Sequence, residues 1–374
     1  MRRCTSALSL AVLTTGLLAG GQPALASTTA ADAIGGPQLA STGLIVQAGV
    51  KAPPKTKANS YVIADAETGE VLAAKNPHGK FLPASTMKAL TALTLIPKLD
   101  KNQTVKPSRA AVNEEGSAVG LVPKPIYKVH DLFRALMMVS GNDCANALSE
   151  ANGGIPATLA DMNAEAKRLQ ANDTVAKTPS GLDKPGQSSS AYDLALIARA
   201  GLQNKDFREY ISTKTAKFPA PKGHYEIGNH NRMLWTYDGM IGVKNGWTSK
   251  AFGSFVGAAK RDGHTIIVSV MRHEESFWKD VEELMNWGFA NRGKTAAVGA
   301  LVDPLPPAQP SPAPSAPAAP VPEGNAAVSE PVAPKRENSG MLATIVLGGG
   351  LVAGVGLLGW GIRRKRRQSP TASS

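Results

Sequence analysis

A proline-rich stretch near the C-terminus limits how much of this 374-residue chain can fold. Residues 304–340 consist largely of Pro, Ala, Ser and Val, and they hold 11 of the chain's 27 prolines. Such a composition has too little apolar surface to offset the entropy that folding costs, and it favours extended, polyproline-like backbone. We therefore expect a Pro/Ala-rich linker over residues 293–340 and a folded domain in the sequence before it.

The segment after the linker has the pattern of a membrane span. Residues 341–362 carry no charge, and at about 1.5 Å per residue a helix of this length would reach roughly 33 Å, enough to cross a bilayer. Residues 363–374 begin with five consecutive basic residues, and clustered positive charge stays on the cytoplasmic side of a membrane. The sequence thus predicts a single transmembrane helix, a basic cytoplasmic tail that contacts anionic lipid, and an extracytoplasmic domain.

The N-terminus has the pattern of an export signal. Two arginines precede a short apolar run, and a small-residue cleavage pattern ends at Ala26, which predicts a signal peptide over residues 1–26. Of the formal net charge of +12, two units lie in this signal and five in the basic tail, so the remaining chain is only mildly basic. Nucleic acid is therefore not expected as a partner.

The sequence between these ends predicts the fold class. Residues 27–57 are rich in small residues and are expected to form a flexible lead, and residues 58–292 are expected to form the folded domain. Strands are predicted near both ends of this domain, over residues 60–64, 70–74, 253–260 and 265–271. Helices are predicted over residues 85–96, 129–139, 144–151 and 277–289. This order predicts an α+β fold in which an antiparallel sheet, built from the two chain ends, packs against a mainly helical region.

Ser85 and Lys88 form a Ser-x-x-Lys motif at the predicted start of a helix. Serine is a favoured capping residue, and residues three apart share one face of a helix, so Lys88 is expected beside the Ser85 hydroxyl. A serine becomes a nucleophile when a base lies within hydrogen-bond reach, and a lysine acts as a base when burial or a neighbouring cation lowers its pKa. The pair therefore predicts a nucleophile with its own base, and Lys244 is a candidate for the neighbouring cation.

Two further motifs follow in order along the chain. Ser140 and Asn142 form Ser-x-Asn, which offers a hydroxyl that can pass a proton and an amide that can hold a substrate amide. Lys244, Asn245 and Gly246 form Lys-x-Gly on a predicted edge strand, where the lysine offers charge to a carboxylate and the glycine permits close approach of the backbone. Each motif alone is weak, because such residues are common in turns and loops. The order of all three in one exported chain is the informative feature.

The ordered motifs resemble those of the serine D-alanyl-D-alanine carboxypeptidases, the low-molecular-mass penicillin-binding proteins, which share a fold with the serine β-lactamases. The resemblance covers about residues 58–292 and is carried by residues 83–88, 139–143, 180–183, 189–194 and 242–248. It implies a β-lactamase/transpeptidase-like fold. It also implies removal of the terminal D-alanine from peptidoglycan stem peptides, with β-lactams as covalent inhibitors.

The resemblance assigns catalytic roles to three residues. Ser85 would form the acyl-enzyme, Lys88 would act as the base, and Ser140 would relay the proton. No cofactor is implied. The histidines, His78 among them, show no spacing typical of metal ligands, so no metal is expected.

The resemblance also assigns substrate-binding roles. Asn142 would orient the peptide, and Lys244 with Thr248 would receive the terminal carboxylate. The backbone N–H groups of Ser85 and Trp247 would donate to the oxyanion. Asn245 and Gly246 would complete this substrate-binding strand.

Asn245 departs from the family pattern, in which Thr or Ser stands between Lys and Gly. An amide can still donate a hydrogen bond, so the departure does not exclude activity. Two alternatives stay open beside a carboxypeptidase. One is a serine β-lactamase, which also needs a device that activates water for deacylation, and no Glu-x-x-Leu-Asn sequence is present between the second and third motifs. The other is a non-catalytic peptidoglycan-binding protein of the same fold, for which Asn245 is the main support.

Overall fold

A computed structural model describes residues 33–306 of the chain. The predicted signal peptide (1–26), transmembrane helix (341–362) and basic tail (363–374) lie outside the described residues, as does the linker beyond residue 306. In the described part, no helix combines the length and the apolar character that crossing a bilayer requires.

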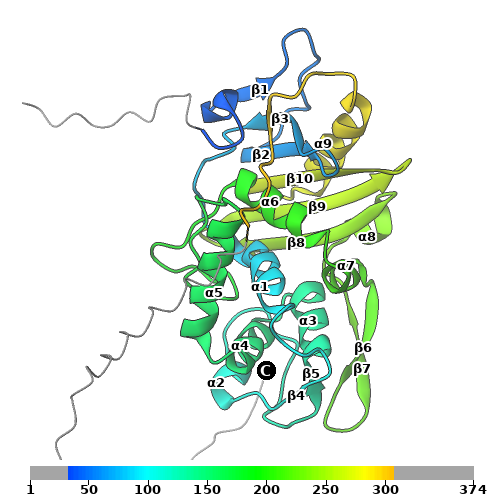
Figure 1. The fold of residues 1–374 in the computed structure, drawn as a ribbon. Coiled ribbons are helices and arrows are strands. Elements are labelled where there is room, and N and C mark those ends of the chain that lie inside the picture. The colour runs from blue at the N-terminus through cyan, green and yellow to red at the C-terminus, as the bar shows by residue number, and fades with distance from the viewer. Residues whose placement is uncertain (1–32, 307–374) are drawn as a thin grey trace, which may run out of the picture. The chain divides into compact units, whose positions relative to one another are not determined.

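Strands from the two ends of the domain form one antiparallel sheet (Figure 1). Its order is β1-β3-β2-β10-β9-β8, and β11 also pairs with β3. Strands β2 and β10 pair in the middle, so the early and late parts of the chain are joined by backbone hydrogen bonds. The strands are β1 (Leu44–Val46), β2 (Ala58–Asp65), β3 (Glu70–Lys75), β8 (Met240–Thr248), β9 (Phe252–Arg261), β10 (His264–His273) and β11 (Gly299–Ala300).

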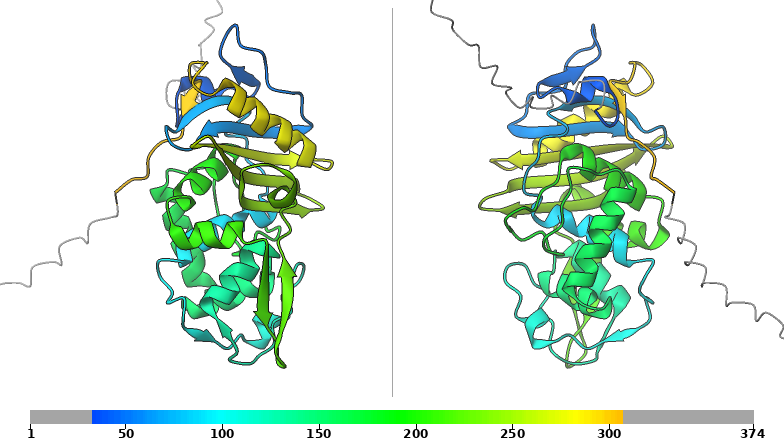
Figure 2. Two further views of the ribbon diagram at one scale, coloured as in Figure 1. Left: turned by 90° about the vertical axis from the view of Figure 1, so that its right-hand side faces the viewer. Right: turned by 60° about the vertical axis from the view of Figure 1, so that its left-hand side comes forward.

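Helices cover both faces of this sheet (Figure 2). Val62 and Ala64 of β2 belong to a core shared with α6 (Ala191–Gly201), whereas Tyr61 and Ile63 pack with α9 (Trp278–Asn291). Alternate residues of a strand point to opposite faces, so a strand between two helical layers needs a continuous apolar run. The sequence of β2 supplies that run.

The helical region adjoins the β8 side of the sheet, and α1 (Met87–Leu95) lies at its centre (Figure 1). Every residue of α1 is buried, because the helix contacts α3, α4, α5 and α6. Lys88 is the charged residue in this buried helix. The other elements are α2 (Arg109–Val112), α3 (Val129–Met138), α4 (Asn142–Ala151), α5 (Ile155–Arg168), α7 (Lys205–Ser212), α8 (Met233–Thr236), and the strand pairs β4 (Thr104–Val105) with β5 (Tyr127–Lys128) and β6 (Thr215–Pro219) with β7 (His224–Gly228).

The predicted order of strands and helices is confirmed, with shifts of a few residues at element ends. The expectation that Ser85 caps a helix is wrong. Ser85 lies inside a 3-10 turn, η3 (Ala84–Thr86), directly before α1, and neither the turn nor the helix has a side-chain capping bond. The hydroxyl is instead free to interact with Lys88.

The expected flexible lead is partly built into the fold. Within residues 27–57, η2 (Pro37–Ala40) buries Leu39 completely, and β1 adds a strand beside β3. The folded part also extends past residue 292, because β11 pairs with β3 and Leu301 is buried. These short apolar stretches find their partners only in the tertiary structure, so local composition did not reveal them.

Candidate active site

The three motifs meet where α1 begins beside the edge strand β8. The η3 turn packs against β8 and β9, and α1 packs against α4, which begins at Asn142. Gly246 marks the closest approach, since a Cβ built at this position would lie 2.5 Å from the Ser85 nitrogen. A side chain here would push the strand away from the nucleophile, which is why the motif needs glycine at this position.

Lys88 lies in a shell of neutral hydrogen-bond acceptors. Its Nζ is 3.0 Å from Ser85 Oγ, 2.7 Å from Asn142 Oδ1 and 2.6 Å from the carbonyl oxygen of Ser180. A neutral amine has two N–H donors and one lone pair. When Asn142 and Ser180 accept the two N–H groups, the lone pair is directed to Ser85, as a base that takes the serine proton requires.

The electrostatics favour the neutral form of Lys88. Burial lowers the pKa of Lys88 well below its ordinary value of 10.5, and the charge of Lys244 lowers it further. Lys244 is itself 1% exposed, and burial lowers its pKa to about 7. Its Nζ donates to the backbone oxygen of Asn245 at 2.7 Å. Two buried lysines with lowered pKa values therefore lie in this site, and one of them, Lys88, contacts Ser85.

Ser140 follows α3 with a backbone φ of +64°. Residues other than glycine rarely adopt this left-handed conformation, and such strain is concentrated at functional sites. The Ser140 hydroxyl is buried and, within residues 33–306, has no hydrogen-bond partner. An unpaired buried hydroxyl is costly, and it is available to a bound substrate.

The segment that supplies the third acceptor for Lys88 was not given a catalytic role in the sequence analysis. Gly181 has φ of +83°, and a Cβ at this position would lie 1.9 Å from the Ala84 carbonyl oxygen. The segment thus packs directly on the turn that carries Ser85, which brings the Ser180 carbonyl to Lys88. A backbone acceptor has no side-chain signature, and residues 180–183 entered the sequence analysis only as part of the family resemblance, so this contact was not predicted.

The remaining predicted residues share β8 with Lys244 and Gly246. Asn245 is half-buried, and Trp247 is 64% exposed. Thr248 donates its hydroxyl to Asp183 Oδ1 at 3.0 Å and accepts from the backbone N–H of Ala251 at 2.9 Å. Their roles toward a substrate stay predictions.

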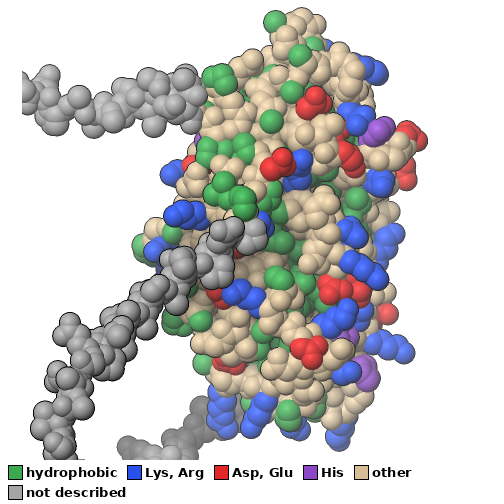
Figure 3. All heavy atoms as spheres, viewed as in Figure 1, with side chains coloured by type: hydrophobic (Ala, Val, Ile, Leu, Met, Phe, Trp, Pro, Cys, Tyr) green, Lys and Arg blue, Asp and Glu red, His purple; other side chains and the backbone are tan. Residues whose placement is uncertain are grey.

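Most cations of the described chain differ from Lys88 and Lys244, because they face solvent. On the face drawn in Figure 3, Lys and Arg side chains gather at the helical end, over α2, β4 and β5. Arg109 of α2 and Lys128 of β5 are both exposed there. Charges of this kind stay hydrated, so they do not have the desolvation cost of a buried charged amine.

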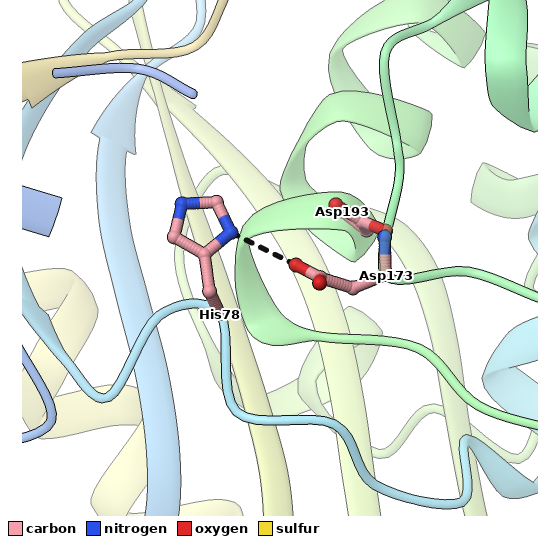
Figure 4. A group of neighbouring side chains, drawn as sticks. All are labelled: His78, Asp173 and Asp193. Carbon is pink, nitrogen blue, oxygen red and sulfur yellow. Dashed lines mark hydrogen bonds and ion pairs between the residues drawn. The ribbon is translucent and has the colours of Figure 1, made fainter. Parts of the chain in front are cut away.

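A second group of titratable side chains lies away from the motifs, where Asp173 and Asp193 approach His78 (Figure 4); His78 and Asp173 are half-buried and Asp193 is buried. Such a group has the donors to hold a metal ion, and the sequence spacing had not indicated it. Its atoms already have protein partners. His78 Nδ1 is 2.8 Å from Asp173 and Nε2 is 3.1 Å from the Ile34 carbonyl oxygen, while Asp193 accepts from the Asp173 N–H and the Thr174 hydroxyl. Hydrogen bonding accounts for this cluster.

Comparison with known proteins identifies the family. The family described as D-alanyl-D-alanine carboxypeptidase matches residues 47–275. The chain belongs to this family. Among its relatives, the D-alanyl-D-alanine carboxypeptidase DacB2 of Mycobacterium tuberculosis is 39% identical over 255 residues, which span 66% of this chain and 87% of the relative.

Solved structures of carboxypeptidases and transpeptidases share the fold. A D-alanyl-D-alanine carboxypeptidase structure from Mycobacterium tuberculosis aligns with a TM-score of 0.67 at 38% identity, over 68% of this chain and 99% of that one. A variant of a Streptomyces DD-transpeptidase aligns with a TM-score of 0.60 at 27% identity, over 63% of this chain and 99% of that one. The predicted β-lactamase/transpeptidase-like fold is therefore confirmed, and the chain is a serine-type D-Ala-D-Ala carboxypeptidase.

Proposed function

We propose that this carboxypeptidase removes the terminal D-alanine from peptidoglycan stem peptides through an acyl-enzyme on Ser85. The observation that carries the proposal is the environment of Lys88, a fully buried amine that lies 3.0 Å from Ser85 Oγ among neutral acceptors. A lysine in such a setting serves as a general base near neutral pH, whereas a solvated lysine stays protonated.

Acylation moves one proton from the Ser85 hydroxyl to the leaving amine. Ser85 Oγ attacks the carbonyl carbon of the penultimate D-alanine, and Lys88 Nζ takes the hydroxyl proton. As the tetrahedral intermediate collapses, the C–N bond breaks and D-alanine leaves as the amine, which takes a proton from the Ser140 hydroxyl. Ser140 regains a proton from Lys88, so the proton taken from Ser85 leaves with D-alanine and Lys88 is neutral again. Water then hydrolyses the ester on Ser85 and releases the shortened stem peptide.

Two groups on β8 favour a substrate that ends in a carboxylate. Lys244 supplies a buried cation for the terminal carboxylate, and a bound anion would raise the pKa of Lys244 and keep it charged. The backbone N–H of Trp247, which follows Gly246 at the closest approach to Ser85, would donate to the oxyanion together with the N–H of Ser85. β-Lactams offer the same carboxylate and an acyl carbonyl, so we expect them to acylate Ser85.

In this proposal the enzyme is an extracytoplasmic, single-pass membrane protein. Support comes from the sequence: the export signal over residues 1–26, the uncharged stretch over 341–362 and the basic cluster after it. The Pro/Ala-rich linker would let the catalytic domain reach a substrate fixed in the cell wall. Deletion of residues 341–374 is expected to release the protein from the membrane fraction, and retention there would contradict the anchor.

The test of the activity is D-alanine release from a stem pentapeptide that ends in D-Ala-D-Ala, measured with the purified full-length chain. We expect steady release by the wild type and a loss of at least about a thousandfold in Ser85→Ala, since the nucleophile is gone. Ser212→Ala, which removes an exposed hydroxyl on α7, is the matched control and should retain full activity. Release that survives in Ser85→Ala would contradict the acyl-enzyme.

The same preparation separates the alternatives. Labelling by a fluorescent penicillin that persists for many minutes is the expected result, and it should be lost in Ser85→Ala. Rapid turnover of a chromogenic cephalosporin without D-alanine release would indicate a β-lactamase. Binding of stem peptides without release would indicate that Asn245 has converted the site into a binding site.

A further inference from the structure

The loop between α2 and β5 holds the amide of Asn142 in one orientation. Asn142 Nδ2 donates to the carbonyl oxygen of Glu115 at 2.7 Å, and the Asn142 backbone N–H donates to the carbonyl oxygen of Ser117 at 2.7 Å. With Nδ2 committed to the loop, Oδ1 faces Lys88 Nζ. A flipped amide would place its N–H groups against the amine of Lys88 and a carbonyl against a carbonyl, so the loop fixes which way the amide points.

Asp143, the next residue, fastens the same loop to α4. Its side chain is completely buried. Asp143 Oδ1 accepts from the Val119 N–H at 3.1 Å, and Oδ2 accepts from the N–H groups of Gly120 at 2.9 Å and Leu121 at 3.0 Å. Three successive backbone donors thus converge on one carboxylate, an arrangement that binds anions well. Oδ1 also accepts from the N–H of Cys144, so each oxygen has two donors.

We propose that Asp143 is a positioning residue for D-alanine release: by gathering the N–H groups of residues 119–121 it holds the loop whose carbonyl groups orient Asn142 at Lys88. The inference rests on the proposed role of Lys88 as the base. Asp143 makes no hydrogen bond to Lys88 and does not contact the substrate in this proposal. It acts on Lys88 through the loop and Asn142.

A neutral amide cannot replace this carboxylate. Asparagine at position 143 would offer one acceptor oxygen, and its NH2 group would face the remaining backbone donors. At least one pair of N–H groups would then lose its acceptor in a buried site, which favours release of the loop. The carbonyl groups of Glu115 and Ser117 would lose their fixed positions at the same time.

The charge of Asp143 acts on Lys88 as well. Burial and Lys244 of β8 lower the pKa of Lys88, while Cys144 and Asp143 of α4 and Glu114 of the loop act in the opposite direction. Release of the loop in a variant without the Asp143 charge would change the pKa of Lys88 in two opposite ways: less burial would raise it, and loss of the negative charge would lower it. The rate of the chemical step and the exchange of the loop amides are therefore better readouts of the positioning role than a pH profile.

The test compares Asp143→Asn with the wild-type full-length chain. We expect kcat for D-alanine release to fall about 10- to 100-fold, because a small misplacement of a proton-transfer pair has an effect of this size. KM should change less than kcat, because the loop holds Asn142, which is predicted to orient the peptide, but not Lys244, which would bind the terminal carboxylate. Amide hydrogen exchange at residues 119–121 should become faster, which reports the loop directly. Asp65→Asn, which alters another buried carboxylate that accepts a backbone N–H, is the matched control and should keep the wild-type kcat per folded molecule.

A second variant keeps the inference testable if Asp143→Asn does not fold. Asn146 Nδ2 donates to Glu114 Oε2 at 2.7 Å, so Asn146→Ala loosens the same loop with a residue that favours helix. Asn146→Ala should also lower kcat, by a smaller factor than Asp143→Asn. Wild-type kcat together with unchanged exchange at residues 119–121, in whichever variant folds, would overturn the positioning role. If the wild type releases no D-alanine, the proposed function fails, and the exchange measurement still tests the loop.

Discussion

Two groups of titratable side chains in this molecule differ in how their charges are compensated. Around Ser85, Lys88 and Lys244 are buried, and the acceptors of Lys88 are all neutral. Around His78, each ring nitrogen faces an acceptor, and one of these is the carboxylate of Asp173. The hydrogen-bond partners of Lys88 thus include no carboxylate, whereas His78 is paired with one.

The difference appears in opposite pKa shifts. Burial and Lys244 lower the pKa of Lys88, as its proposed role as the base requires. For His78, burial opposes the charged ring, but the hydrogen bond to Asp173 and its charge outweigh burial and raise the pKa. A site that holds charge without compensation is prepared for chemistry or for an ionic ligand, whereas a compensated cluster contributes to stability.

The largest expected effect comes from removal of the uncompensated amine. Lys88→Met keeps a similar volume but removes the base, so kcat/KM for D-alanine release should fall at least about a thousandfold. Lys279→Met, which removes an exposed cation on α9, is the control and should leave kcat/KM unchanged. Activity in Lys88→Met within tenfold of the wild type would mean that another group serves as the base.

The next largest effect is expected at the segment whose backbone carbonyl group is the third acceptor for Lys88 Nζ. In Gly181→Ala the new Cβ would meet the Ala84 carbonyl oxygen, so the segment must move and withdraw the Ser180 carbonyl from Lys88. We expect kcat to fall about a hundredfold. Gly263→Ala is a matched control, since Gly263 has a similar φ of +82° with open space around it.

The two glycine variants differ only in the contact made by the new methyl group. Gly263→Ala should lower the free energy of unfolding by about 1 kcal/mol through backbone strain and leave kcat unchanged. Equal effects of the two substitutions on kcat would show that the close packing of Gly181 on Ala84 does not support the site.

The outline of the fold and the three motifs could be predicted from the sequence, because the apolar runs in β2 and β10 and the motif residues are local signals. The shell around Lys88 could not. Its third acceptor is a backbone carbonyl, and Asp143 acts through main-chain N–H groups, so neither has a spacing signature. Ser85 was misplaced as a helix cap for a similar reason: its hydroxyl is used by Lys88 and not by the backbone.

Strand β1 and the His78 cluster show a second limit. Leu39 and the residues of β1 lie in a stretch of small residues; Leu39 is buried in the folded domain, and β1 pairs with β3. Asp173 and Asp193 lie far from His78 in the sequence, and the fold alone brings them together. Long-range pairs of this kind carry no periodicity that a sequence reading can detect.

The pH dependence of acylation tests whether the charge of Lys244 acts on Lys88. The charge of Lys244 lowers the pKa of Lys88, so removal of that charge in Lys244→Met should raise the pKa of Lys88. The rate of acylation by penicillin, which rises with pH as Lys88 loses its proton, should then rise only at higher pH than in the wild type. If the rise of the acylation rate in Lys244→Met occurs at the same pH as in the wild type, or at a lower pH, the influence of Lys244 on Lys88 is contradicted.

The smallest expected effect concerns the compensated cluster. The pKa of His78 is raised, so its contribution to stability is present below about pH 6.5 and is lost as pH rises through the higher folded pKa. Burial and the neighbouring Asp173 raise the pKa of Asp193 to about 7, which acts in the same direction. The contribution of this cluster to stability should therefore decline as pH rises, whereas the lowered pKa values of Lys88 and Lys244 make their contribution rise with pH. The effect of the cluster is thus measured as the difference between the wild type and a variant at His78.

His78→Asn should remove the His78 part of that decline and cost about 1–2 kcal/mol at pH 6, because two hydrogen bonds to the ring are lost. Denaturant unfolding at several pH values measures both effects. His264→Asn, at the exposed first residue of β10, is the control. A pH dependence unchanged by His78→Asn would show that the cluster does not titrate in this range, and D-alanine release at pH 6 should be unaffected in either case.

The most direct test of the account is the titration of Lys88 itself. In the full-length protein labelled with 13C at lysine Cε, the Lys88 resonance is assigned by its absence in Lys88→Met and followed with pH. The account predicts a titration well below the ordinary lysine value of 10.5, and a higher midpoint in Lys244→Met. A Lys88 resonance that titrates near 10.5 would contradict the claim that burial without a carboxylate partner makes this lysine the base.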